Sequence, residues 1–266
     1  MRSPLFRLAT FALACLALAP AAGAADAIST DRPDFVESSE ALDPGRVQIE
    51  TGFQSERDAA RGTRIRTRTT PTLLRFGLSD TLEFRIETDG LTLERTRDST
   101  LGASSDRGWS DLGIGLKWHA QDGSEESGTP GMAWLLHVDA DTGSSAFRGQ
   151  GLRPSLRFVA EWDLAHDTSV GVMPGIALER NADGKRFVSA IFAVTASTAW
   201  TPAWATFVEL AARQIASKAN GGSVVTFDAG ATYLVNDSLK LDVSMARGLT
   251  HDSPDFAWGV GASVRF

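Results

Sequence analysis

This chain of 266 residues contains only one cysteine, one tyrosine and four histidines. The single cysteine, Cys15, has no second cysteine with which to close an internal disulfide. After residue 24 no stretch approaches the roughly 18 consecutive apolar residues of a membrane-spanning helix. The net charge of −7 argues against nucleic acid as a partner, because nucleic-acid recognition depends on basic surfaces. Helical 3.6-residue periodicity is also rare, which argues against a helical protein.

The N-terminus has the pattern of a secretory signal peptide, residues 1–24. Two arginines precede an apolar run over residues 8–19, and Ala22-Gly23-Ala24 supplies a cleavage site. Cleavage after Ala27 is the alternative. Lipid attachment at Cys15 is the weaker alternative, because the apolar run continues past it to a normal cleavage site. We therefore predict export, by a cleaved signal peptide, to the outer membrane of a Gram-negative-type bacterium.

Alternation of apolar and polar residues recurs about twelve times between residue 46 and the C-terminus. The clearest case is the last stretch, in which Phe256, Trp258, Val260, Ala262, Val264 and Phe266 share one face. Period-two alternation predicts strands, but a soluble sandwich with one wet face would alternate equally well. The pattern alone therefore predicts an all-β protein that is either a large barrel or a sandwich pair.

The aromatic residues decide between barrel and sandwich. If both termini are periplasmic, most of the aromatic side chains fall beside tight turns such as 79–80 and 236–237. Longer Gly- and Ser-rich loops are expected at the opposite end, at residues 97–108, 142–151, 216–223 and 248–255, with 121–131 as a long exception on the short-turn side. Rings at headgroup level and unequal loops are typical of outer-membrane barrels. The predicted membrane-interface girdle is Trp118, Trp134, Trp162, Trp200, Trp204, Tyr233, Trp258 and Phe266.

The sequence thus predicts a single closed antiparallel transmembrane β-barrel of about 12 strands over residues 46–266, preceded by a short periplasmic lead, residues 25–45. A slip in the apolar phase between Asp89 and Leu91 predicts a bulge at Gly90. The polar face of each strand would then line the lumen. These lumen-lining positions are Glu50, Arg75, Glu83, Arg85, Glu87, Asp111, Lys117, His119, His137, Asp139, Arg157, Glu161, Glu209, Arg213, Asp228, Lys240, Asp242 and Arg265.

Acidic groups outnumber basic ones among the inward positions, to which parity also adds Asp163 and Glu179. Buried charges must pair or stay hydrated, and an unpaired acidic excess favours cations or neutral solutes. We therefore expect a small, cation-preferring conductance. The alternative is a non-conducting structural or surface-binding barrel, whose lumen is plugged by its own ion pairs.

The first residues of the predicted mature chain carry a resemblance to a known family. Thr30-Asp31-Arg32-Pro33-Asp34-Phe35, Glu37-Ser38, Pro44-Gly45 and Gln48-Ile49-Glu50-Thr51-Gly52-Phe53 resemble the opening of the outer-membrane transporters named after the MetA pathway of phenol degradation. The resemblance continues to the terminal strand. It implies a barrel that passes small, aromatic or hydrophobic compounds, and it supplies no catalytic residue.

Neither catalysis nor a cofactor is predicted. His137 and Asp139 share a face with His119 one strand away, but no nucleophilic serine is placed beside them. We expect no metal site either, since Asp31 to Asp34 lack the oxygen-rich spacing of a calcium loop.

Two further partners are expected besides a small-molecule solute and membrane lipid. Phe266 ends an alternating strand, which resembles the signal that the outer-membrane assembly machinery reads. Arg64, Arg66 and Arg68 share parity with outward apolar residues, where they would meet lipopolysaccharide phosphates. A bulge at Pro71 would instead turn them inward or leave them in a solvated loop.

Overall fold

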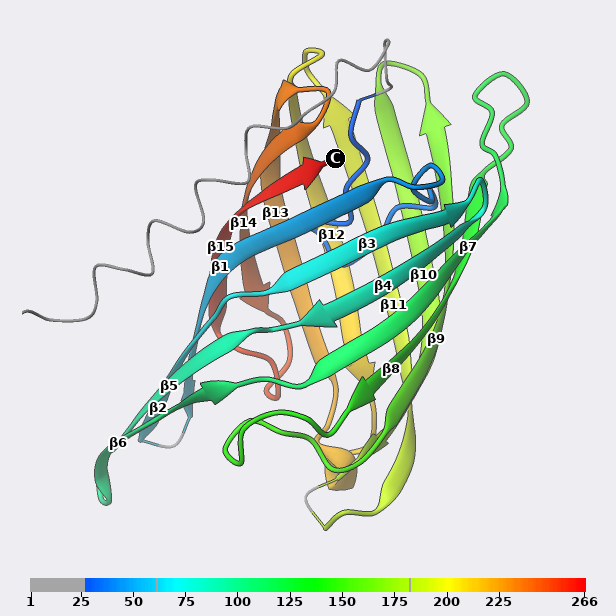
Figure 1. The fold of residues 1–266 in the computed structure, drawn as a ribbon. Helices are drawn as coiled ribbons and strands as arrows, with labels where there is room; N and C mark the ends of the chain where they lie inside the picture. The colour runs from blue at the N-terminus through cyan, green and yellow to red at the C-terminus, as the bar shows by residue number, and fades with distance from the viewer. Residues whose placement is uncertain (1–26, 61, 182) are drawn as a thin grey trace, which may run out of the picture.

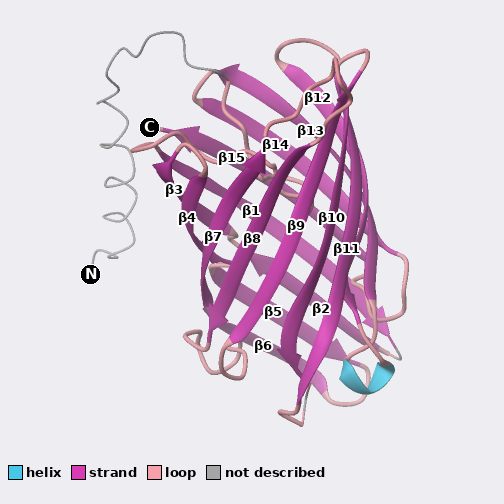
Figure 2. Cartoon of the chain, turned by 90° about the vertical axis from the view of Figure 1, so that its right-hand side faces the viewer, coloured by secondary structure: helices cyan, strands magenta, loops and turns pink. Residues whose placement is uncertain are grey.

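The protein is an antiparallel β-barrel, seen from two sides in Figures 1 and 2. The computed structural model describes residues 27–266, apart from 61 and 182. The predicted signal peptide lies outside these residues. The strands are β1 (Val47–Ala60), β2 (Thr63–Thr69), β3 (Thr72–Ser79), β4 (Leu82–Thr88), β5 (Leu91–Asp98), β6 (Gly102–Trp109), β7 (Leu112–Gln121), β8 (Gly131–Ala140), β9 (Arg153–Leu164), β10 (Thr168–Arg180), β11 (Arg186–Ala199), β12 (Trp204–Ile215), β13 (Val224–Asn236), β14 (Leu239–Gly248) and β15 (Phe256–Arg265).

The sheet closes on itself because the last strand, β15, pairs with the first, β1. The terminal Phe266 continues this pairing, since its N–H donates to the Val47 carbonyl at 2.8 Å. Closure leaves no unpaired sheet edge in the hydrocarbon region, which is the condition for a spanning sheet. The prediction of a closed 12-strand antiparallel barrel is therefore confirmed.

Fifteen strands make twelve crossings because three crossings are interrupted. The breaks fall at Thr70-Pro71, Asp89-Gly90 and Ser110-Asp111. Proline has no N–H for the ladder, and Gly90 adopts a left-handed φ of 68°. Even-numbered side chains such as Ile86 point outward before this break, and odd-numbered ones such as Leu93 point outward after it. This is the change that the phase slip predicts, although the structure has a strand break there rather than a bulge.

One predicted loop is wrong. Residues 97–108 form the end of β5 and most of β6, a regular hairpin in which Arg97 pairs with Ala103 and Leu93 with Arg107. Its Gly, Ser and Asp residues resemble a loop in sequence, but ladder hydrogen bonds to β5 hold them extended. With β1 and β2 these strands form a four-stranded extension beyond the barrel wall, at the lower left of Figure 1. The predicted long loops at 142–151, 216–223 and 248–255 do lie outside the strands.

The two faces of the wall differ sharply. Outward apolar side chains such as Ile114 are about half exposed, at 54 %, whereas the inward Lys117 on the same strand is fully buried. An exposed apolar belt around a buried polar interior is the arrangement of a lipid-embedded barrel. Among the described residues, no helix has the length and apolar character needed to cross a bilayer. The short helix η3 (Lys218–Asn220) lies at the long-loop end (Figure 2).

The described part of the predicted lead, residues 27–45, lies inside the barrel, a path that the sequence does not predict. It enters near the β13–β14 turn, where the Ile28 N–H donates to the Asp237 carbonyl, and then runs inside the lumen before joining β1. Ile28, Asp31, Val36, Glu37 and Leu42 are all buried. The physical reason is that the lumen wall offers its charged side chains as partners for the lead.

Candidate functional site: the lead inside the lumen

Carboxylates of the wall bind the backbone of the lead. Glu50 accepts hydrogen bonds from the N–H groups of Asp31 and Arg32, at 3.0 to 3.2 Å. Glu209, on β12, accepts those of Phe35 and Val36. In the same way Glu83 accepts from Leu42, and Glu161 from Ser39. Glu161 and Glu209 are thus bound by backbone N–H groups, whereas Glu50 and Glu83 also pair with Arg75. The backbone partners account for part of the acidic excess seen in the sequence.

Cations of the wall bind the carboxylates of the lead. Asp31 lies 2.8 Å from Lys117 Nζ, 3.0 Å from Arg85 Nη2 and 3.5 Å from Arg75 Nη1. Its Oδ1 also accepts the Ser38 N–H at 2.8 Å, so the carboxylate closes a turn of the lead on itself. Unpaired charges in such a site would be very costly. Removing the lead would therefore leave these three wall cations without their shared counter-ion.

Glu37 is the second acidic residue of the lead that the wall binds. It pairs with Arg85, and its Oε1 lies 2.7 Å from Arg157 Nη1. The Arg85 guanidinium thus bridges Asp31 and Glu37 and connects the two carboxylates of the lead.

Arg32 makes the opposite kind of contact, in which a cation of the lead pairs with a carboxylate of the wall. Its Nη2 lies 3.0 Å from Asp242 Oδ1 on β14. The guanidinium fills space left by Gly52 and Gly261, which are direct partners across the β1–β15 closure. A Cβ on either glycine would collide with this guanidinium. These inward glycines therefore make a socket for one side chain of the lead.

An apolar contact fixes the innermost turn of the lead. Val36 packs in a buried cluster with Leu135, Val159, Met173, Ala193 and Ala211, from five successive strands, β8 to β12. The neighbouring Phe35 ring lies under two guanidinium groups, 4.6 Å from Arg213 Cζ and 5.8 Å from Arg157 Cζ. Contacts on β1, β3, β4, β7 to β12 and β14 mean that the lead crosses the lumen from wall to wall.

Three acids in the buried part of the lead respond differently to their surroundings. Burial alone would raise the pKa of Asp31, but Arg75, Lys117 and Arg85 outweigh it and hold that pKa below its ordinary value. Glu37 behaves likewise, because Arg85 and Arg157 outweigh its burial and lower its pKa. For Asp34, burial together with the charge of Glu209 raises the pKa well above the ordinary value. The lead is thus held by two ionised carboxylates and carries a third that favours its protonated form.

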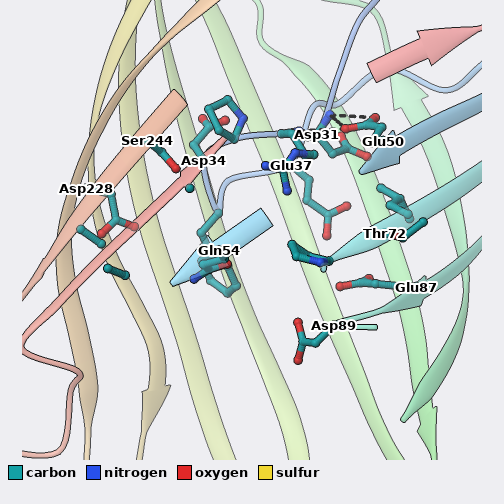
Figure 3. A pocket seen from close by; sticks show the side chains of 18 of the residues that line it. Asp31, Asp34, Glu37, Glu50, Gln54, Thr72, Glu87, Asp89, Asp228 and Ser244 are labelled. Atoms are coloured by element: carbon teal, nitrogen blue, oxygen red, sulfur yellow. Dashed lines mark hydrogen bonds between the residues drawn. The ribbon is translucent and has the colours of Figure 1, made fainter. Parts of the chain in front are cut away.

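A cavity of about 240 Å³ lies between the lead and the long-loop end of the barrel. Figure 3 shows the carboxylates of Glu87, Asp89 and Asp228 around it, with Asp34 and Glu37 of the lead on its inner side. Arg157 and Arg213 also line it. The cavity is therefore charged, and the lead forms one of its walls.

Sixteen of the eighteen predicted lumen positions lie on the inner face of the wall, and Arg265 and Asp111 lie at its margins. Arg265 lies at the rim and donates to the Asp237 carbonyl. Asp111 lies at the β6–β7 break and binds backbone N–H groups of the 142–149 loop as well as Arg153. His119 contacts Ser39 and Asp122, and His137 contacts Asp139. The others face the lead or the cavity.

Sequence reasoning missed the functional residues of the lead itself and the apolar seat of Val36. The lead has no periodicity, so nothing in it marks Asp31 or Glu37 as lumen residues. The seat does leave a signal: Leu135 and Val159 are apolar at inward positions where the pattern predicts polar side chains. Such a break in parity marks a place where something other than water covers the wall.

The predicted girdle residues occupy the outer face. Trp118, Trp134, Trp200, Trp204, Tyr233, Trp258 and Phe266 are 38 to 69 % exposed. Trp134 packs against Phe158 and Trp204 against Tyr233, with ring centroids 4.8 and 4.9 Å apart. All except Trp258 lie near the short-turn end, and Trp258 contacts Phe53 toward the other end.

Comparison with known proteins agrees with this architecture. Residues 30–266 match the family model described as "Putative MetA-pathway of phenol degradation". The chain belongs to this family. The match begins within the lead, so the family pattern includes the segment in the lumen as well as the barrel, and the resemblance noted from the sequence is confirmed. No curated protein matches the chain.

Solved structures share the fold at low sequence identity. The COG4313 outer membrane channel from Pseudomonas putida F1 is 16 % identical, with a TM-score of 0.61 over 86 % of this chain and 98 % of that one. The β domain of the Bordetella autotransporter BrkA is 13 % identical, with a TM-score of 0.51 over 84 and 100 %. The KdgM porin is 12 % identical, with a TM-score of 0.50 over 82 and 99 %. These likenesses support the outer-membrane barrel fold.

Proposed function

We propose that the protein is a gated outer-membrane channel for small solutes, in which the lead is the gate. The observation that carries the proposal is the double set of contacts across the lumen: wall acids bind the N–H groups of the lead, and wall cations bind its carboxylates. Solute passes only when the lead leaves or rearranges within the lumen.

The bonding of the lead suits a gate better than a permanent core. Apart from Val36 and the buried side chains of Ile28 and Leu42, the lead is held mainly by hydrogen bonds and ion pairs. These polar contacts can be exchanged for water in a hydrated lumen, whereas a purely apolar core would resist separation. Ile28 and Gly45, near the two termini of the lead, both bond to residues at the short-turn end of the barrel. The lead can therefore withdraw as a loop from this side without threading through the barrel.

The cavity indicates the size of solute. A cavity of roughly 150 Å³ holds benzene, so the 240 Å³ cavity accommodates a compound of about one ring with polar substituents. Its charged lining favours polar over purely hydrocarbon solutes. Displacing the lead removes partners from wall acids such as Glu209 and also from wall cations such as Lys117. Because acids outnumber basic groups among the inward wall positions, the open lumen favours cations or neutral compounds over anions.

The competing function is a non-conducting barrel that is permanently filled by the lead. The extent of the ion-pair network favours this alternative, because buried pairs are costly to separate. A catalytic role has no such support. Within the described part of the chain no serine hydroxyl bonds to a histidine ring, and His137 instead contacts Asp139 at 3.1 Å.

At the membrane, we propose that the outward aromatic residues anchor the barrel at the lipid headgroups. We also propose that the β15 strand ending in Phe266 is the part of the chain that the assembly machinery recognises. The 50 % exposure of the Phe266 side chain leaves it accessible for both roles.

Single-channel recording in a planar bilayer tests the proposed function. We expect a closed baseline with brief openings, and a reversal potential in a potassium chloride gradient that indicates cation preference. Silence of the wild type and of variants with a weakened lead would favour the non-conducting barrel. Anion selectivity would contradict the role given to the wall acids.

A further inference from the structure

The outer face of the four-stranded extension carries seven arginines, here called the arginine grid: Arg57 on β1, Arg64, Arg66 and Arg68 on β2, Arg95 and Arg97 on β5, and Arg107 on β6. We infer that the arginine grid binds the phosphate groups of lipopolysaccharide in the outer leaflet. This inference rests on the placement of the barrel in the outer membrane and not on conduction through the lumen.

Strand register puts all seven side chains on one face. Arg57 lies directly opposite Arg66, which lies opposite Arg95, so these three form a row across the strands. Arg64 and Arg97 form the next row toward the tip. Arg68 on β2 and Arg107 on β6 both lie directly opposite Leu93 of β5, one on each side of it. They form the row nearest the barrel. Residues directly opposite in a ladder share a face, with Cβ atoms about 5 Å apart.

The grid faces outward. Arg57 is paired with Phe256 on β15, and its Cζ lies 5.3 Å from the centre of that ring. Trp258, two residues further along β15, is 42 % exposed on the same face, whereas Ala257 between them is buried. The break at Thr70-Pro71 does not change the parity, because Thr72 and Leu74 remain on the outer face with Arg68. The arginines therefore point away from the lumen.

The depth of the grid matches a headgroup layer. The next row toward the barrel centre on the same face holds Phe53, Leu91 and Trp109, and Trp109 is 62 % exposed. Apolar and aromatic residues thus give way to arginines within one row, a spacing of roughly 7 Å along a strand. Aromatic rings mark the boundary between the acyl chains and the headgroups, so the arginines lie at the level where lipid phosphates are found.

The guanidinium groups have no anionic partner among the described residues. Three acids of the same strands, Glu56, Glu94 and Asp106, share a row on the opposite, inner face. Like charges directly opposite one another destabilise a sheet. An external anion that bridges adjacent arginines offsets this repulsion, and phosphate matches the guanidinium fork bidentately.

The test uses purified lipopolysaccharide as the probe and the full-length barrel in detergent. The variant R66Q/R95Q/R97Q removes the centre of the grid. The matched control R186Q/K185Q/K218Q removes the same charge from exposed residues at the same end of the barrel but outside the grid. Affinity is measured by titration with intact lipopolysaccharide and with lipopolysaccharide whose phosphates have been removed. Inorganic phosphate is added as a competitor.

We expect the grid variant to bind intact lipopolysaccharide at least about tenfold more weakly than wild type, because three charge-assisted contacts are lost. The control should bind like wild type, and removal of the phosphates should abolish the difference. Millimolar inorganic phosphate should compete only weakly. Equal affinity of wild type and grid variant, or an equal loss in the control, would overturn the inference. Full competition by inorganic phosphate would reduce the grid to a general anion site and would also overturn it.

Discussion

Replacing Asp31 with asparagine tests how firmly the ion pairs hold the lead. The substitution keeps the size of the side chain and an oxygen that can still accept the Ser38 N–H, but removes the negative charge that Lys117, Arg85 and Arg75 share. Breaking a buried pair by neutralising one partner costs about 3–5 kcal/mol. The hydrogen bonds that asparagine retains place this change near the lower figure.

About 3 kcal/mol corresponds to a shift of roughly a hundredfold in the equilibrium between the closed and open lumen. A wild-type open fraction of about 0.1 % would rise to roughly 10 % in Asp31→Asn. Single-channel recording measures this open fraction directly. Heat-modifiable migration checks that the barrel itself has assembled.

The matched control is Asp43→Asn. Asp43 belongs to the same lead but is exposed at its exit, and its side chain pairs with no cation among the described residues. Its open fraction should therefore equal that of wild type. An unchanged open fraction in a well-assembled Asp31→Asn barrel would refute the reasoning, and so would an equal increase in Asp43→Asn.

Three further substitutions probe other parts of the account. Burial and Glu209 raise the pKa of Asp34, so a proton on this carboxyl favours the closed lumen. Raising the pH through this pKa should increase the open fraction, and Asp34→Asn should flatten that pH profile in recordings. Gly261→Ala fills the socket of Arg32 and should increase the open fraction by roughly tenfold, which is the effect of one weakened charge-assisted bond. The yield of assembled barrel should stay normal, and an unchanged open fraction would exclude this socket from gating. Deleting Phe266 removes the last pairing with β1 and should lower the yield of heat-modifiable barrel in membranes without reducing secretion, and a normal yield would argue against its role in assembly.

Alternation in the sequence predicts the wall well, because backbone pairing forces successive side chains to opposite faces. Lys117 and Trp118 are neighbours in sequence, yet one is fully buried in the lumen and the other is 52 % exposed on the outside. This local rule needs no knowledge of which strands are adjacent. The inner and outer residue sets could therefore be assigned from the sequence alone.

The lead could not be placed in this way, because its partners are distant in sequence and no local rule connects them. Arg32 and Asp242 form one pair across 210 positions. The extension was hidden for a different reason. β6 has almost no apolar residues, since it extends past the membrane, and its strand geometry comes from pairing with β5 rather than from its own composition.

A disulfide between the lead and the wall tests most directly whether the lead must move. A Cβ placed on Gly131 lies 3.6 Å from Ser39 Cβ, within the range of about 3.5–4.5 Å that a disulfide requires. The only native cysteine, Cys15, lies in the predicted signal peptide, so Ser39→Cys/Gly131→Cys introduces one defined pair, and the two single variants serve as controls. We predict that the oxidised double variant is silent in a planar bilayer and that a reductant restores wild-type openings. Wild-type conductance from fully cross-linked protein would contradict the gate.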